Sequence, residues 1–329
     1  MKGAAETQAT YFVDAGDAFF KNAYVIESKR DHLTEVAKAI LQSYNTMDCK
    51  VMNMGTHDLG AGIDFILDLE KEANFPFISA NIVKAGTDEL LFQKYAIVKS
   101  LDRTLGFVGV TLGDKRLKEF DFKDPVEAAK LSVEEIRDKV DMVFLMANVN
   151  DKIEKQLTEE IDGVDFLLRS QTGSVLRNPR EQDGEVIIRI GKQGKYAGLL
   201  RIQSMDKTSE LKNVSSQYTR IKFTDNRLAA MRKGLDENIT LEDHYAGDEK
   251  RLLLIERLRK ERQTNIDLIK SLKNTYYLEA IPLNDKIADT PEVAKIVKEY
   301  MPVVKEKSQK EKKQGKAEKK EERVSTKKH

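Results

Sequence analysis

The chain has 329 residues, of which 40% are hydrophobic and 34% are charged, with no tryptophan and a single cysteine. This length fits one or two domains. Because Cys49 is alone, the sequence excludes an intrachain disulfide and a C-x-x-C metal site, and we expect a small buried side chain there. No stretch approaches the ~20 consecutive apolar residues that a membrane-spanning helix needs, so no membrane span is expected.

The formal net charge of +1 conceals a division along the chain. Residues 301–329 hold ten Lys and one Arg against five Glu, whereas the remainder holds 45 basic and 50 acidic residues. The Lys/Glu-rich tail, residues 304–329, has almost nothing apolar to bury, so we expect it to be solvated and disordered. A contact with an anionic surface or a partner is the alternative. Nucleic acid is not an expected partner, because the interspersed glutamates weaken the positive field.

Through residue 204 the pattern alternates predicted strands and helices, which favours an α/β fold. Apolar residues at helical spacing predict helices over 28–44 and 63–73. Asp124 followed by Pro125 predicts the start of a third helix, because these residues suit the N-cap and the first helical turn. The run MVFLMAN at 142–148 predicts a strand buried on both faces. Further predicted strands are 11–20, 49–55, 75–82, the hairpin of 91–100 with 105–112, 164–170, 185–191 and 195–204, which closes the sheet region.

From about residue 205 the sequence becomes mainly helical. QYTRIKFT at 217–224 predicts one last strand, and helices are predicted over 226–235 and 248–280. The apolar stripe of the second helix is interrupted by Arg262 and Asn265, so a helical hairpin and a coiled coil for self-association both remain open. The predicted organisation is an α/β domain over 1–204, a helical segment over 205–303 and the tail over 304–329.

Short motifs in a fixed order carry a family resemblance. Residues 11–20 read YFVDAGDAFF, 53–60 read NMGTHDLG, 141–150 read DMVFLMANVN and 162–173 read DGVDFLLRSQTG. This order resembles the 5′-nucleotidase branch of the calcineurin-like metallophosphoesterases. That consensus runs D-x-G-D, G-N-H-[ED], a strand ending in S-H-x-G, and G-V-D-x-x-x-G-G-H-T-H. The resemblance implies a β-sandwich flanked by helices, in which two metal ions clamp a phosphoryl group and activate water.

Most of the expected metal ligands are replaced. By resemblance, Asp17 stands at the bridging aspartate, and His57, followed by Asp58, stands at the histidine that assists the leaving group. Asn148 replaces the histidine of S-H-x-G, and Gln171 replaces the first histidine of G-H-T-H. Neutral amides are weaker ligands than imidazole. We therefore expect His57 and Asp58 to be vestigial catalytic residues, and Asp17, Asn148 and Gln171 to be a vestigial metal site.

Other positions strengthen this expectation. Thr56 replaces the ligand asparagine, and Gly173 replaces the second histidine of G-H-T-H and offers no ligand. The whole chain has only four histidines, so the usual dinuclear site cannot be assembled. We expect no cofactor, with one weakly bound Mn or Zn ion as the alternative. Arg169 stands where the family has glycine and is an anion-binding candidate.

Only ten residues precede the YFVDAGD strand, where the family has an earlier strand ending in D-x-H. The sequence therefore predicts a fold that lacks this first strand. We expect either an upstream extension that encodes a signal segment and a strand, or a genuinely shortened cytoplasmic form. By resemblance the setting is the periplasm or the cell surface.

Three hypotheses follow. The first is a degenerate 5′-nucleotidase homologue that acts as a non-catalytic binding or scaffold protein. The second is a weak metal-dependent phosphoesterase that hydrolyses nucleotides with a reduced site. The third is an interaction protein, whose helical segment binds an unknown protein partner or self-associates through residues 248–280.

Overall fold

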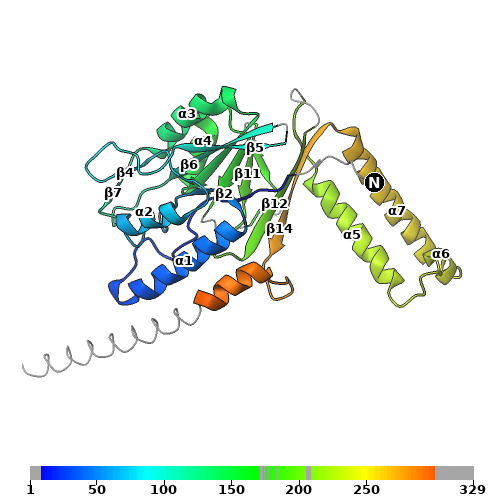
Figure 1. The fold of residues 1–329 in the computed structure, drawn as a ribbon. Coiled ribbons are helices and arrows are strands. Elements are labelled where there is room, and N and C mark those ends of the chain that lie inside the picture. The colour runs from blue at the N-terminus through cyan, green and yellow to red at the C-terminus, as the bar shows by residue number, and fades with distance from the viewer. Residues whose placement is uncertain are drawn as a thin grey trace, which may run out of the picture. The chain divides into compact units, whose positions relative to one another are not determined.

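The structure is a computed structural model that describes residues 9–300, except residues 102, 171, 172, 174, 177, 183 and 205–208 (Figure 1). Gln171 and the tail therefore lie outside the described residues. The chain divides into two compact units. Unit 1 comprises Met1–Val175, Arg180–Tyr196 and Pro282–His329, and unit 2 comprises Leu176–Pro179 and Ala197–Ile281.

A six-stranded sheet forms the centre of unit 1, in the order β10-β11-β9-β8-β6-β5. Strand β8 (Met142–Asn148) is buried at every position, as its apolar run predicts. It pairs in parallel with β6 (Arg103–Thr111) and β9 (Phe166–Arg169). The predicted hairpin is confirmed, since β5 (Tyr95–Ser100) pairs antiparallel with β6. The other edge consists of β11 (Glu185–Arg189) and β10 (Arg180–Gln182).

A second, parallel sheet in unit 1 has the order β1-β2-β3. Its strands are β1 (Phe12–Asp14), β2 (Cys49–Asn53) and β3 (Phe77–Ile78). The strand predicted over 75–82 is divided, because its last residue begins β4 (Ile82–Lys84), which pairs with β7 (Phe120–Phe122). Cys49 is buried and free, as expected.

Helices cover both sides of the paired sheets of unit 1 (Figure 1). Helices α1 (Arg30–Thr46) and α2 (Ile63–Glu72) share an apolar core with the three-stranded sheet. Helices α3 (Pro125–Ile136) and α4 (Asp151–Glu160) pack on the six-stranded sheet. Asp124 caps α3 as predicted, because its carboxylate accepts the backbone N–H of Val126 at 2.8 Å. Single 3₁₀ turns lie at Glu27–Lys29 and Arg137–Lys139, and residues 291–300 are helical.

Unit 2 combines a small sheet with a helical hairpin. The sheet has the order β12-β14-β13, formed by β12 (Tyr196–Ser204), β14 (Asn274–Pro282) and β13 (Lys212–Asn213). The hairpin consists of α5 (Ser215–Arg232), the short helix α6 (Leu241–His244) and α7 (Glu249–Ser271). The hairpin alternative is therefore what the structure contains within one chain.

Three expectations for this region are wrong. Residues 217–224 form no strand and belong to α5, where buried Thr224 contributes to the packed face. The helix predicted over 248–280 ends at Ser271, and the aromatic run after it forms β14, which suits the β propensity of Tyr276 and Tyr277. The strand at 195–204 exists as β12, but it pairs with β14 and does not close the central sheet. Within the described residues, none of the helices is both long and apolar enough for a membrane crossing.

The packing of α4 generates a stability prediction. Leu157 on α4 is 0% exposed, whereas Leu131 on α3 is 56% exposed. Leu157→Ala should lower the free energy of unfolding by about 2–5 kcal/mol, because it removes buried methyl groups and leaves a cavity. Leu131→Ala should change it by no more than about 0.5 kcal/mol. Urea unfolding followed by far-ultraviolet circular dichroism checks both, and equal losses would contradict the assigned core.

Candidate functional site

The candidate site lies where strands of unit 1 end. Asp17 follows β1, His57 and Asp58 follow β2, and Asn148 is the last residue of β8. Loops at the carboxyl ends of parallel strands are the usual position of sites in α/β folds. The structure brings Asp17, His57 and Asn148 together, as the motif resemblance implies.

The Asp17 carboxylate connects the three loops. Its Oδ1 accepts the backbone N–H of His57 at 2.7 Å, and its Oδ2 accepts the side-chain amide of Asn148 at 2.7 Å. The same Oδ2 lies 3.7 Å from Nδ1 of His57. The Asp17 side chain is only 3% exposed, whereas that of His57 is 26% exposed. The carboxylate is therefore enclosed, and the imidazole is the group that solvent reaches.

Two glycines allow this arrangement. Asp17 has a φ of 67°, and Gly16 before it has a φ of 104°, a region that favours glycine. A Cβ on Gly55 would lie 2.2 Å from Oδ1 of Asp17, which is far inside van der Waals contact. The glycines of D-x-G-D and N-M-G-T-H thus bring the carboxylate against the neighbouring loop.

Asp58 is fully buried and accepts hydrogen bonds from the backbone. Its carboxylate accepts the N–H groups of Asp17 at 2.7 Å, Phe19 at 2.9 Å and Gly55 at 2.9 Å. Burial raises the pKa of Asp58 well above its usual range, and repulsion from Asp17 adds to this. These contacts give Asp58 a positioning role: it fixes the loop that carries Asp17.

The amide of Asn148 is hydrogen-bonded through both its oxygen and its nitrogen. Its Nδ2 donates to Asp17 and to Oγ of Ser170, the latter at 2.8 Å. Its Oδ1 accepts the backbone N–H of Thr56 at 3.3 Å and lies 3.1 Å from the Thr56 hydroxyl, which also lies 2.7 Å from the carbonyl of Leu112. The sequence did not identify Ser170, and only its position beside the replaced histidine of G-H-T-H could have signalled it.

These donors do not fit a dinuclear metal centre. Both oxygens of Asp17 accept hydrogen bonds from the protein, and the oxygen of Asn148 is engaged by Thr56. A Cβ added to Gly173 would meet no other group within 4 Å, and glycine contributes no side-chain ligand atom. In the described part of the chain, no group of three or more His, Cys, Asp or Glu side chains is arranged to hold a metal ion. A catalytic site needs about three such ligands for each ion.

Arg169 lies at the end of β9 and is engaged by the protein itself. Its Nη1 contacts Oε2 of Glu154 at 2.8 Å and also pairs with Asp151. Arg180 and Arg189 contact the same buried Glu154, at 3.1 Å and 2.9 Å. Three guanidinium groups therefore surround one buried carboxylate, a cluster that the sequence did not reveal. Anion binding by Arg169 stays a prediction.

Comparison with known proteins shows which proteins this chain is similar to. No protein-family model matches the chain. The chain is 26% identical over 162 residues to the 2′,3′-cyclic-nucleotide 2′-phosphodiesterase/3′-nucleotidase of Haemophilus influenzae, covering 44% of this chain and 25% of that protein. It is 27% identical over 150 residues to protein UshA of Escherichia coli, covering 43% and 26% respectively. The solved structure of Haemophilus influenzae NAD nucleotidase shares the fold, with a TM-score of 0.54 and 13% identity over 90% of this chain and 51% of that one.

The chain is similar in sequence to nucleotidases of the calcineurin-like metallophosphoesterase type, and it shares their fold. It spans about a quarter of the length of the curated relatives it matches. These similarities confirm the resemblance drawn from the motifs and the mixed α/β fold that it implies.

Asp14 in the same loop generates a pH prediction. Its carboxylate accepts the Tyr44 hydroxyl at 2.7 Å and the Gly16 N–H at 2.8 Å, and burial raises its pKa. Because the folded chain then holds this proton more tightly than the unfolded chain, the free energy of unfolding falls as pH rises from about 4 through the raised pKa. Asp14→Asn cannot ionise, yet its amide can accept from Gly16 and donate to Tyr44.

The stability of Asp14→Asn relative to the native chain should therefore be greater at about pH 7 than at about pH 4. Urea unfolding at the two pH values measures this difference. Asp88→Asn, at an exposed position paired with Lys123, is the control and should show little pH-dependent gain. An equal effect of Asp14→Asn at both pH values would show that Asp14 carries no such penalty.

Proposed function

We propose that this 5′-nucleotidase homologue has a degenerate metal site and acts as a non-catalytic binding or scaffold protein. The observation that supports this is the pair of 2.7 Å hydrogen bonds to Asp17, one from the His57 backbone and one from the Asn148 amide. By resemblance, Asp17 stands at the aspartate that would bridge two metal ions. Here both of its carboxylate oxygens accept hydrogen bonds from the protein.

The chemistry of phosphoester hydrolysis explains why this matters. A two-metal centre supplies both the nucleophile and the charge clamp on the phosphoryl oxygens. The His57 imidazole beside Asp17 could bind or orient a polar ligand, since it is partly exposed. A single imidazole replaces neither the metal-activated water nor the charge clamp of a two-metal centre. Binding without turnover is therefore the activity that fits these residues.

A weak phosphoesterase is the second candidate. The 3.7 Å approach of Nδ1 of His57 to Asp17 favours it, because an Asp–His pair could take part in holding one Mn or Zn ion. Asn148 and Gln171 would complete such a reduced site. A single ion would have to displace the Asn148 amide from Asp17, and this displacement would weaken its binding.

The scaffold part of the proposal assigns partner binding to the helical segment, residues 205–303. The α/β domain over 1–204 then serves as a platform. The proposed setting, by family likeness, is the periplasm or the cell surface. A protein partner fits this assignment better than nucleic acid, because residues 1–300 carry 50 acidic and 45 basic side chains.

The proposal predicts background hydrolysis and little metal. The purified chain and the Asp17→Ala/His57→Ala double variant should hydrolyse nucleoside monophosphates and a chromogenic phosphodiester equally slowly with manganese present. Elemental analysis after dialysis against manganese or zinc should find well under one equivalent. If the native chain is much faster than the double variant, or holds two ions tightly, the weak phosphoesterase replaces the non-catalytic protein as the proposed function.

A further inference from the structure

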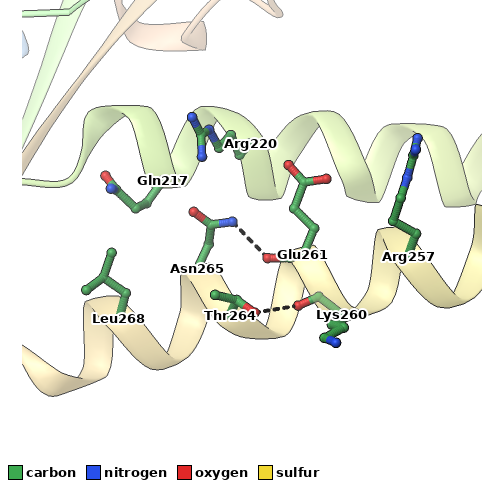
Figure 2. Close-up of a pocket in the computed structure, with 8 residues that line it drawn as sticks. All are labelled: Gln217, Arg220, Arg257, Lys260, Glu261, Thr264, Asn265 and Leu268. Atoms are coloured by element: carbon green, nitrogen blue, oxygen red, sulfur yellow. Dashed lines mark hydrogen bonds between the residues drawn. The ribbon is translucent and has the colours of Figure 1, made fainter.

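A groove runs between two helices of unit 2. Helices α5 and α7 lie side by side, and the groove between them has a volume of about 390 Å³ (Figure 2). Its lining includes the cationic side chains of Arg220, Arg257 and Lys260, together with Glu261. The groove therefore carries three positive charges against one negative charge.

The cations of this groove differ from their neighbours in the hairpin. Arg262 pairs with Asp225 across the two helices at 2.6 Å, and Arg259 forms a salt bridge with Glu242. Arg220, Arg257 and Lys260 form no salt bridge with any residue that the structure describes. Three side chains that would gain from a carboxylate partner therefore converge on one surface.

Exposed apolar side chains flank the cations. On α7, Leu253, Arg257, Lys260 and Leu268 recur at intervals of four, three and eight residues, which places them on one face of the helix. Leu253 is 59% exposed and Leu268 is 45% exposed. Phe223 on α5 is 61% exposed. The face thus has a positive centre with apolar ends, which suits an occupant that is acidic and partly apolar.

The tip of the same hairpin has this complementary character. Residues 233–248 hold five acidic side chains and one lysine, whereas α5 and α7 together hold eleven basic and five acidic side chains. The tip also exposes Ile239 beside Glu237, and the Glu237 side chain forms no ion pair in the described part of the chain. One element therefore presents both a cationic groove and an acidic, partly apolar end.

We propose that a second copy of this chain covers the groove, with the acidic tip of each hairpin lying on the cationic groove of the other. This deepens the proposed scaffold function, on which it rests, by naming the partner. Lys260 lies eleven residues beyond the start of α7 at Glu249, about 17 Å along the helix. Two antiparallel hairpins that overlap by this length bring both tips onto both grooves, and a two-fold axis makes the two contacts identical.

The charge pattern favours a second copy over a polyanion. A nucleic acid or an anionic membrane that lay along the hairpin would contact the acidic tip as well as the basic helices α5 and α7. The acidic tip would repel it. An antiparallel copy avoids this, because each acidic region faces a basic one.

Sedimentation velocity on the full chain tests this with charge reversals. The native chain should dimerise at tens of micromolar protein in about 50 mM salt, and the dimer should weaken at least about tenfold in about 500 mM salt, where charges are screened. The groove variant Arg257→Glu/Lys260→Glu and the tip variant Asp236→Lys/Glu237→Lys should each be monomeric. An equimolar mixture should restore a dimer, because each altered surface then meets its complement.

The control is Lys118→Glu/Lys130→Glu, which makes the same charge change at exposed positions in unit 1 and should leave the dimer intact. Circular dichroism verifies that each variant is folded. A native chain that stays monomeric at about 100 μM in low salt, or a dimer that survives both the groove and the tip variants, overturns the proposal. A monomer whose groove instead binds an acidic peptide or nucleic acid also overturns it. Sedimentation does not test the metal site. The degenerate-site proposal is tested separately by the hydrolysis and metal assays.

Discussion

The Asp17 carboxylate, hydrogen-bonded to the His57 backbone and to the Asn148 amide, is the interaction on which the candidate site depends. It joins the loops after β1, β2 and β8, which belong to two different sheets. In the resemblance drawn from the motifs, Asp17 stands at an aspartate that would hold metal ions. Here an amide N–H supplies the positive end of a dipole in that place. A neutral donor can hold a carboxylate, but it cannot activate water or neutralise a phosphoryl group.

The residues behind the site reinforce this substitution. Arg169 stands at the family's glycine position, and its Nε donates to the carbonyl of Val149, directly after Asn148. Its guanidinium also pairs with buried Glu154 on α4, which two further arginines contact. Removing one partner of a buried ion pair typically costs about 3–5 kcal/mol. The end of β8 is therefore held on one side by Asp17, which accepts from Asn148, and on the other by Arg169, which donates to Val149.

Much of the fold was predictable because apolar runs and helix caps are signals within a few neighbouring residues. The apolar run at 142–148 identified a fully buried strand, and Asp124 with Pro125 identified the start of α3. The prediction was wrong at residues 217–224. Alternating apolar residues suggested a strand there, but these residues belong to helix α5, which packs on α7. It also extended α7 beyond Ser271, because helical spacing continued into a run that pairs as β14.

The candidate site was predictable only where motifs marked it. Asp17, His57 and Asn148 come together as the motif order implies, although they lie up to 131 residues apart in the chain. Ser170 and the pairing of three arginines with Glu154 were not predicted, because long-range side-chain pairing leaves no periodic signal in a sequence. Gln171 lies outside the described residues, so its vestigial role stays a prediction.

We propose that protein hydrogen bonds hold this site in place of bound metal ions. Thermal unfolding of the native chain and of Asn148→Ala, each with EDTA and with about 1 mM manganese, tests this proposal. We expect manganese to leave the melting temperature of the native chain unchanged. Asn148→Ala should lower the free energy of unfolding by about 1–3 kcal/mol in both conditions, because buried donors and acceptors lose their partners. A ligand present at 100 times its Kd would stabilise the native chain by about 2.7 kcal/mol. Such a gain with manganese, together with an Asn148→Ala variant as stable as the native chain, would show that metal and not these hydrogen bonds holds the site.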